Sequence, residues 1–181
     1  MKLGIKFDKE RGLPLILTGI IILVDQCTKA FIAAKWPISD NNVIADVFNN
    51  GFLQILHRRN DAIAFSLGRN MPDSIKPALF VVVPLLVLGV LLWYYLKSDD
   101  FTRMQRWAVA GILGGGMGNI IDRIFRPAGV VDFIDIKFYG LFDFERWPTF
   151  NAADSSVVVC CILLFITIII DSKNKKPEAA K

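Results

Sequence analysis

The sequence predicts an all-α polytopic membrane protein with four transmembrane helices, a small extracytoplasmic β-sheet and an interfacial aromatic-rich loop. Of its 181 residues, 54% are hydrophobic, and the mean hydropathy of +0.46 lies above the usual range of soluble domains. Four segments are also long and apolar enough to cross a bilayer core of about 30 Å: residues 13–34, 75–96, 107–125 and 155–170. We therefore expect a single membrane domain over residues 1–181.

The first apolar segment follows a basic tail, as the core of a removable signal peptide does. Asp25 and Lys29 interrupt this segment, however, and no small-x-small cleavage site follows it. We therefore favour a permanent span over a removable leader.

Basic residues indicate the orientation of the spans, because short loops rich in Lys and Arg remain in the cytoplasm. They are concentrated in the two tails, residues 1–12 and 171–181, and in the short loop between the second and third spans. Both termini are therefore expected in the cytoplasm, and the loops at residues 35–74 and 126–154 on the outer side. This distribution accounts for the net charge of +4, so no nucleic-acid partner is needed.

The two outer loops differ in character. The first contains "NGFLQILHRRNDAIAFSLG", in which apolar runs bounded by turn residues predict one or two short strands. The second is rich in aromatic residues, which favour the headgroup region of a bilayer. A simple interfacial anchor would explain these aromatics equally well, but it would not explain the acids between them.

Polar side chains within the spans are costly and are therefore candidates for functional sites. Asp25 and Lys29 lie four residues apart and can form an ion pair on one helix face, with a structural role the simpler alternative. Asn119 and Arg123 have the same spacing and can point into one polar pocket. Asp122 does not face its neighbour Arg123 on a helix, so each needs a partner elsewhere.

The third span also carries glycines, and these do not indicate a phosphate-binding loop, because no Gly-Lys-Ser/Thr follows. Gly111, Gly115 and Gly118 recur at helical spacing together with Asn119 and Asp122. Such a stripe of small and polar residues allows another helix to approach closely.

Asp132 follows the third predicted span by a few residues and Asp154 opens the fourth, which puts both at the expected outer face although 22 positions separate them. Two carboxylates held close together in an apolar setting share a proton, so that one acts as an acid and the other as a base. Such a pair can hydrolyse an amide. Asn151 can face the same way as Asp154 or cap the last helix. On spacing alone, two solvated interfacial acids explain the pattern equally well.

Neither a metal nor an organic cofactor is expected. Asp135, Asp143 and Glu145 could join a cation site, but they lack a recognisable ligand spacing. Cys27, Cys160 and Cys161 lie within predicted spans and are interpreted as small core residues. His57 is the single histidine, and nothing near it suggests a catalytic triad.

Five segments, in this order, resemble the lipoprotein signal peptidases (signal peptidase II) of bacteria: "VDQCTK", "RNDAIAFS", "GGGMGNIIDR", "VVDFID" and "FNAADS". The resemblance covers roughly residues 14 to 170. It implies an inner-membrane aspartyl protease that cleaves diacylglyceryl-modified prolipoproteins before the lipidated cysteine, and that is inhibited by the cyclic lipopeptide globomycin.

Matched to the family's motifs, Asp132 and Asp154 are the expected catalytic dyad. The supporting or substrate-binding positions are Asn60, Asn119, Arg123 and Asn151, together with Asp122, Asp25 and Lys29. We expect the enzyme to work as a monomer in contact with membrane lipid. One departure from the pattern is Ala62, where the family usually has glycine, and the length of residues 137–150 has no assigned role.

Two other hypotheses belong to different functional classes. A small proton or ion carrier would use Asp25, Lys29, Asp122 and Arg123 as a relay, but such a relay needs ionisable residues throughout the bilayer depth. A purely structural subunit would tolerate neutral substitutions at Asp132 and Asp154. The gathering of acids at one face and the order of the motifs favour the protease.

Overall fold

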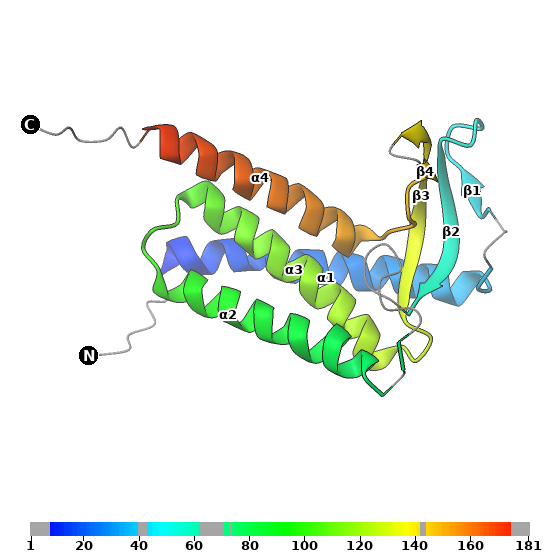
Figure 1. Cartoon of the computed structure of the whole chain (residues 1–181), viewed down its shortest axis with the longest axis horizontal. Helices are drawn as coiled ribbons and strands as arrows, with labels where there is room; N and C mark the ends of the chain where they lie inside the picture. The colour runs from blue at the N-terminus through cyan, green and yellow to red at the C-terminus, as the bar shows by residue number, and fades with distance from the viewer. Residues whose placement is uncertain (1–7, 40–42, 62–70, 73, 142–143, 175–181) are drawn as a thin grey trace, which may run out of the picture.

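The computed structural model of the chain describes residues 8–39, 43–61, 71–72, 74–141 and 144–174. The long helices lie side by side, and a small sheet crosses one end of the bundle (Figure 1). The opposite end holds the start of α1, the connection between α2 and α3, and the end of α4. The helices are α1 (Lys9–Lys35), the π-helical turn η2 (Ala78–Val82) continued by α2 (Val83–Lys97), α3 (Arg103–Phe125) and α4 (Ala152–Asn174).

Three helices have the length and apolar composition of membrane spans: Lys9–Lys35, Ala78–Lys97 and Ala152–Asn174. Each overlaps one of the predicted segments, and α4 extends further at both ends than residues 155–170. The predicted third span coincides with α3, which has 23 residues but does not reach the same apolar composition. That α3 also crosses the bilayer remains a prediction.

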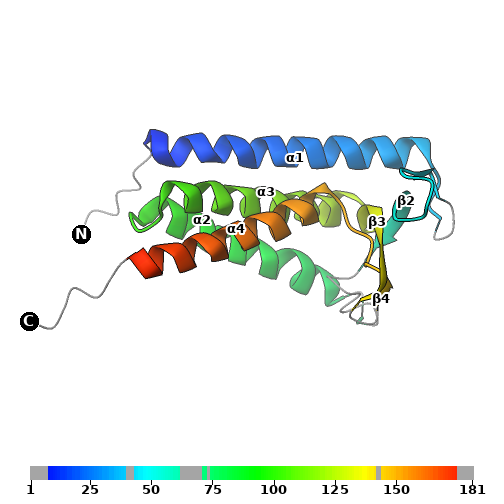
Figure 2. The same cartoon turned by 90° about the horizontal axis from the view of Figure 1, so that it is seen from above.

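The polar composition of α3 follows from its central position. It lies between α1 on one side and α2 and α4 on the other (Figure 2). About half of its residues are buried, including Gln105, Arg106 and Asp122. Because its neighbours shield it from lipid, α3 needs fewer apolar side chains than a helix whose surface faces the bilayer.

The glycine stripe of α3 lets its neighbours approach closely, as its spacing predicted. A Cβ atom on Gly118 would lie 2.7 Å from Asp25 Oδ2 and 3.1 Å from the Ala153 side chain. A Cβ on Gly115 would overlap the carbonyl oxygen of Ala153. Glycine is therefore required at these positions so that α1 and the start of α4 can reach α3.

Four antiparallel strands form the sheet in the order β1 (Ala45–Asp46), β2 (Leu53–Asn60), β3 (Val130–Leu141) and β4 (Phe144–Arg146). The predicted strand in the first outer loop is confirmed as β2. Strands β3 and β4, which supply half of the sheet, lie within the aromatic-rich residues 126–154 and were not predicted. The register places Arg58 opposite Asp132 and Asn60 opposite Val130, so the first outer loop meets "VVDFID".

Candidate active site

Asp132 and Asp154 meet where the start of β3, the start of α4 and the last turns of α3 converge. Asp132 is the third residue of β3 and Asp154 lies in the first turn of α4. Both line one cavity of about 830 Å³. The structure therefore brings together the two carboxylates that the sequence singled out.

Asp154 is fixed by a reciprocal pair of hydrogen bonds with Asn151, the residue just before α4. The backbone N–H of Asp154 donates to Asn151 Oδ1 at 3.0 Å, and the backbone N–H of Asn151 donates to Asp154 Oδ2 at 3.1 Å. This is the geometry of a capping box. The positive end of the helix dipole favours a negative charge on Asp154.

Asp132 accepts hydrogen bonds from two amides. Asn60 Nδ2 donates to Oδ2 at 3.0 Å, and Asn151 Nδ2 donates to Oδ1 at 2.7 Å. Burial, and after it the negative charge of Asp154, raise the pKa of Asp132 from 3.8 to about 7, although the bonds from Asn60 and Asn151 oppose the rise. Asp132 therefore retains its proton close to neutral pH.

Asn119 links this pair of acids to α1. Its Nδ2 donates to Asp154 Oδ1 at 2.7 Å, while its Oδ1 accepts from Lys29 Nζ at 2.9 Å and from Asn151 Nδ2 at 3.1 Å. Because an ammonium group only donates, Lys29 fixes which end of the Asn119 amide faces Asp154. The two asparagines therefore orient both carboxyl groups.

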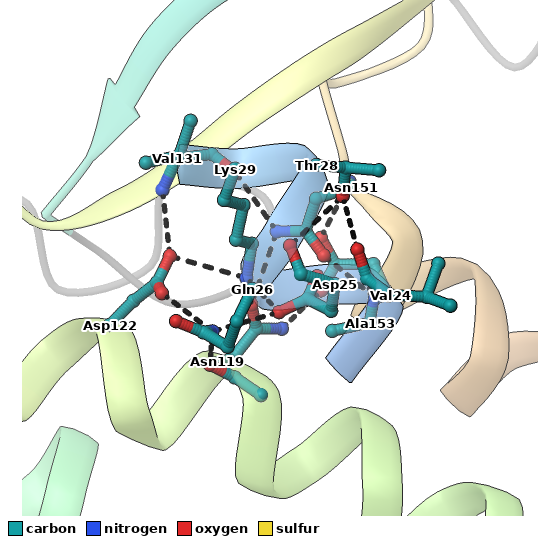
Figure 3. A network of polar contacts seen from close by, with 12 residues as sticks. Val24, Asp25, Gln26, Thr28, Lys29, Asn119, Asp122, Val131, Asn151 and Ala153 are labelled. Carbon is teal, nitrogen blue, oxygen red and sulfur yellow. Dashed lines mark hydrogen bonds and ion pairs between the residues drawn. The ribbon is translucent and has the colours of Figure 1, made fainter. Parts of the chain in front are cut away.

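A buried charge cluster supports the site from behind. Lys29 Nζ lies 2.8 Å from Asp25 Oδ2 and 3.2 Å from Asp122 Oδ2, and all three side chains are fully buried. Figure 3 shows Lys29 reaching from α1 towards both acids and Asn119. The predicted ion pair between Asp25 and Lys29 is thus present, and Asp122 shares the same cation.

The two acids of this cluster hold the backbone on either side of the site. Asp25 Oδ1 accepts from the N–H of Ala153 at 3.0 Å, next to Asp154. Asp122 Oδ2 accepts from the N–H of Val131 at 3.1 Å, next to Asp132. A single buried network thereby positions the start of α4 and the start of β3 relative to each other.

Gln26 belongs to this network, although we did not single it out from the sequence. Its Nε2 donates to Asp122 Oδ1 and to the carbonyl of Gly118, both at 3.0 Å, and its Oε1 accepts from Arg126 at 2.9 Å. The available signal was a polar amide beside Asp25 in an otherwise apolar span. Arg126 also forms an ion pair with Asp122.

The cavity has a polar end and an apolar side. Asn60, Asn119 and Arg123 line it beside the two acids, and Arg123 Nη1 donates to the carbonyl of Asn119 at 3.2 Å. The predicted common pocket of Asn119 and Arg123 is therefore present. The apolar side includes residues from η2, α2, α3 and α4: Phe80, Pro84, Ile120, Val157, Val158 and Val159. Such a cavity suits an amphiphilic chain.

The other acids of the outer segments have different partners. Asp135 is buried and forms ion pairs with Arg146 and, at 3.6 Å, with Arg58. Glu145 lies 3.4 Å from Lys137 Nζ. Asp143 lies outside the described residues, as does Ala62. In the part of the chain that the structure describes, no group of three His, Cys, Asp or Glu residues is arranged to hold a metal ion.

The interpretation of the cysteines as core residues was wrong for two of the three. Cys160 is buried against Gly111, whereas Cys27 and Cys161 are exposed on the outer surfaces of α1 and α4. His57 is buried in β2, where its Nδ1 lies 2.8 Å from the carbonyl oxygen of Trp36. None of these four residues lines the cavity that contains Asp132 and Asp154.

Comparisons with known proteins agree on one family. The family model of signal peptidase (SPase) II matches residues 17–170. The lipoprotein signal peptidase of Treponema pallidum (strain Nichols) is 41% identical over 170 residues, covering 93% of this chain and 89% of the relative. That of Treponema denticola is 46% identical over 169 residues, covering 93% and 95%. A bacterial membrane enzyme solved by the in meso method at 2.3 Å resolution has a TM-score of 0.76 and 28% identity, covering 94% and 95% of the two chains.

Proposed function

The chain belongs to the signal peptidase II family, a family of proteases that remove signal peptides from prolipoproteins, and on that premise we propose that it is an aspartyl endopeptidase whose catalytic residues are Asp132 and Asp154. One observation carries the proposal. The two carboxyl groups line the same cavity and are linked through two amide side chains in series: Asn151 Nδ2 donates to Asp132 and to Asn119 Oδ1, and Asn119 Nδ2 donates to Asp154.

The environments of the two acids suggest their roles. Asp154 accepts hydrogen bonds from Asn119 and from the backbone at the start of a helix, which stabilises its carboxylate. Asp132 is buried, with 3% of its surface exposed, and its pKa is raised to about 7. We therefore assign Asp154 as the general base and protonated Asp132 as the general acid.

The reaction then proceeds through a bound water molecule. Asp154 takes a proton from the water while the water oxygen bonds to the scissile carbonyl carbon, and Asp132 gives its own proton to the carbonyl oxygen. In the second step the carbon–nitrogen bond breaks. Asp154 gives its proton to the leaving nitrogen. Asp132 recovers a proton from one of the two hydroxyl groups on the former carbonyl carbon, and the oxygen of that group becomes the carbonyl oxygen of the new carboxyl group. The pair regains its starting state.

The substrate that we propose is a diacylglyceryl-modified prolipoprotein, cleaved immediately before the lipidated cysteine. The amphiphilic cavity supports this assignment, because its apolar side suits acyl chains or a signal helix and its polar end suits an extended backbone. Globomycin, a cyclic lipopeptide, would occupy the same cavity and compete with the substrate. No observation favours the ion carrier, since the buried charges of Asp25, Lys29 and Asp122 gather beside the sheet.

We further propose that the enzyme is a monomer of the bacterial inner membrane with both termini in the cytoplasm. Lys9, Arg11, Lys97 and Arg103 lie at the end of the bundle opposite the site, which supports this orientation. The site would then face the outer surface.

Cleavage of a purified precursor tests the substrate assignment. Diacylglyceryl-modified and unmodified forms of one prolipoprotein are incubated with the enzyme in micelles, with and without globomycin, and the products are identified by mass spectrometry. We expect one product that begins with the modified cysteine, made from the modified precursor alone and suppressed by globomycin. Equal cleavage of the unmodified form, or cleavage at another bond, would contradict the assignment.

A further inference from the structure

A second, shallower cavity lies on the outer side of α1, beneath the sheet. It has a volume of about 460 Å³ and is lined by Cys27, Thr28, Phe31, Ile32, Ile55 and Phe133. The hydroxyl of Thr28 donates to the carbonyls of Val24 and Asp25 on its own helix. The groove, as we call this cavity, is therefore apolar.

The groove continues a lipid-facing stripe of α1. Leu23, Cys27 and Phe31 follow each other at intervals of four residues, so they lie on one face of the helix. All three are exposed on a helix with the length and composition of a membrane span. Such an apolar groove suits an acyl chain, because water gains no hydrogen bonds there.

The stripe ends in a positive charge at the level of the sheet. Lys35 lies four residues after Phe31, and its Nζ is 4.9 Å from the centroid of the Phe31 ring. Trp36 packs edge-on against the same ring at 5.6 Å. A lysine beside a tryptophan at the end of a span is typical of the headgroup region. Lys35 forms no ion pair with any residue that the structure describes, so its charge is available to an anion.

The acyl chains of the substrate cannot be the occupants. Phe133 lines the groove, while its neighbour Asp132 lines the cavity of the proposed active site. Consecutive residues of a strand point to opposite faces, so β3 separates the two cavities. A lipid attached next to the scissile bond would leave from the side of Asp132, not from that of Phe133.

We propose that the groove is a binding site for a membrane phospholipid with a negatively charged headgroup. One acyl chain lies against Cys27, Phe31 and Phe133, and the phosphate pairs with Lys35. The exclusion of the substrate's acyl chains rests on the proposed catalytic residues, whereas the groove itself is lined from the other face of β3.

Cys27 provides a direct test, because a bound acyl chain covers its thiol. The protein is placed in bilayer discs of phosphatidylcholine alone or with phosphatidylglycerol, treated with a lipophilic maleimide, and analysed by mass spectrometry for modification of each cysteine. Cys161, exposed on α4 away from the groove, is the internal control for access of the reagent. Lys35→Gln is compared with Lys97→Gln, which removes an equivalent lysine above the Trp93 ring at the opposite end.

We expect phosphatidylglycerol to lower the ratio of Cys27 to Cys161 modification about fivefold, as the attraction of one lysine for an anionic lipid implies. Lys35→Gln should abolish this protection and Lys97→Gln should retain it. An unchanged ratio in the two lipids, or equal behaviour of the two variants, would overturn the proposal. Cleavage of prolipoprotein by the same samples shows separately whether the catalytic assignment holds.

Discussion

The raised pKa of Asp132 predicts that this single carboxyl group makes the protein less stable as the pH increases. The native state holds the proton more tightly than the unfolded chain, with a pKa of about 7 against 3.8. The carboxyl group therefore does not lower the unfolding free energy below about pH 4. Above that pH it lowers the unfolding free energy progressively, until the pH passes through 7. Between pH 5 and pH 8 this amounts to roughly 2.5 kcal/mol of unfolding free energy.

Asp132→Asn removes the titration and leaves the shape of the side chain. The amide has one acceptor oxygen, so it loses the bond from Asn60 or from Asn151, at a cost of about 1–3 kcal/mol that does not vary with pH. The variant is therefore expected to be less stable than the wild type at pH 5 and to recover most or all of that difference by pH 8.

The assay is denaturant-induced unfolding in micelles at pH 5, 6, 7 and 8, comparing the wild type with Asp132→Asn. Glu145→Gln is the matched control, since Glu145 is largely exposed and forms its ion pair with Lys137. The difference between wild type and Asp132→Asn should change by roughly 2.5 kcal/mol across this range, and that between wild type and Glu145→Gln should stay nearly constant. Parallel curves for wild type and Asp132→Asn would refute the assigned protonation state.

Three further outcomes are expected. Cleavage activity, measured as initial rates in a pH series, should fall above about pH 7 as Asp132 loses its proton, and the fall should approach tenfold for each further pH unit. A rate that holds steady to pH 9 would contradict this. Lys29→Met leaves two fully buried carboxylates without their shared cation and should cost about 3–5 kcal/mol in unfolding free energy; a loss below 1 kcal/mol would show that the cluster contributes little. Gly118→Ala should destabilise the protein by about 1–3 kcal/mol, because the added methyl group meets Asp25. Gly19→Ala, with open space around it, should be neutral or stabilising. Equal thermal shifts for the two variants would argue against the close packing of α3.

The helices and β2 could be predicted from the sequence because each depends on a local pattern. Strand β3 could not, because it lacks the alternation of a half-exposed strand. Val130, Val131, Asp132 and Phe133 are all buried, since α1 covers one face of the strand and the candidate active site occupies the other. With both faces buried, the aromatic and apolar residues indicated a surface loop as readily as a strand.

Spacing along the sequence could predict contacts within one helix of the site, but not contacts between helices. The ion pair of Asp25 and Lys29 followed from one helical turn, whereas Asp122 reached the same lysine only through the packing of α3 against α1. The exposed cysteines show that hydropathy within a span does not predict burial. An apolar residue in a membrane span can face lipid as readily as protein, so hydropathy alone did not place Cys27 on the surface.

The most direct test of the account is single-turnover cleavage of a diacylglyceryl-modified prolipoprotein by Asp132→Asn and Asp154→Asn, with Glu145→Gln as the acid-to-amide control. Circular dichroism and the unfolding midpoint establish that each variant is folded. Each dyad variant should lose cleavage by at least about a thousandfold, since the reaction needs both the acid and the base, and Glu145→Gln should cleave like the wild type. Substantial cleavage by either folded dyad variant would contradict the assignment of Asp132 and Asp154 as the catalytic pair.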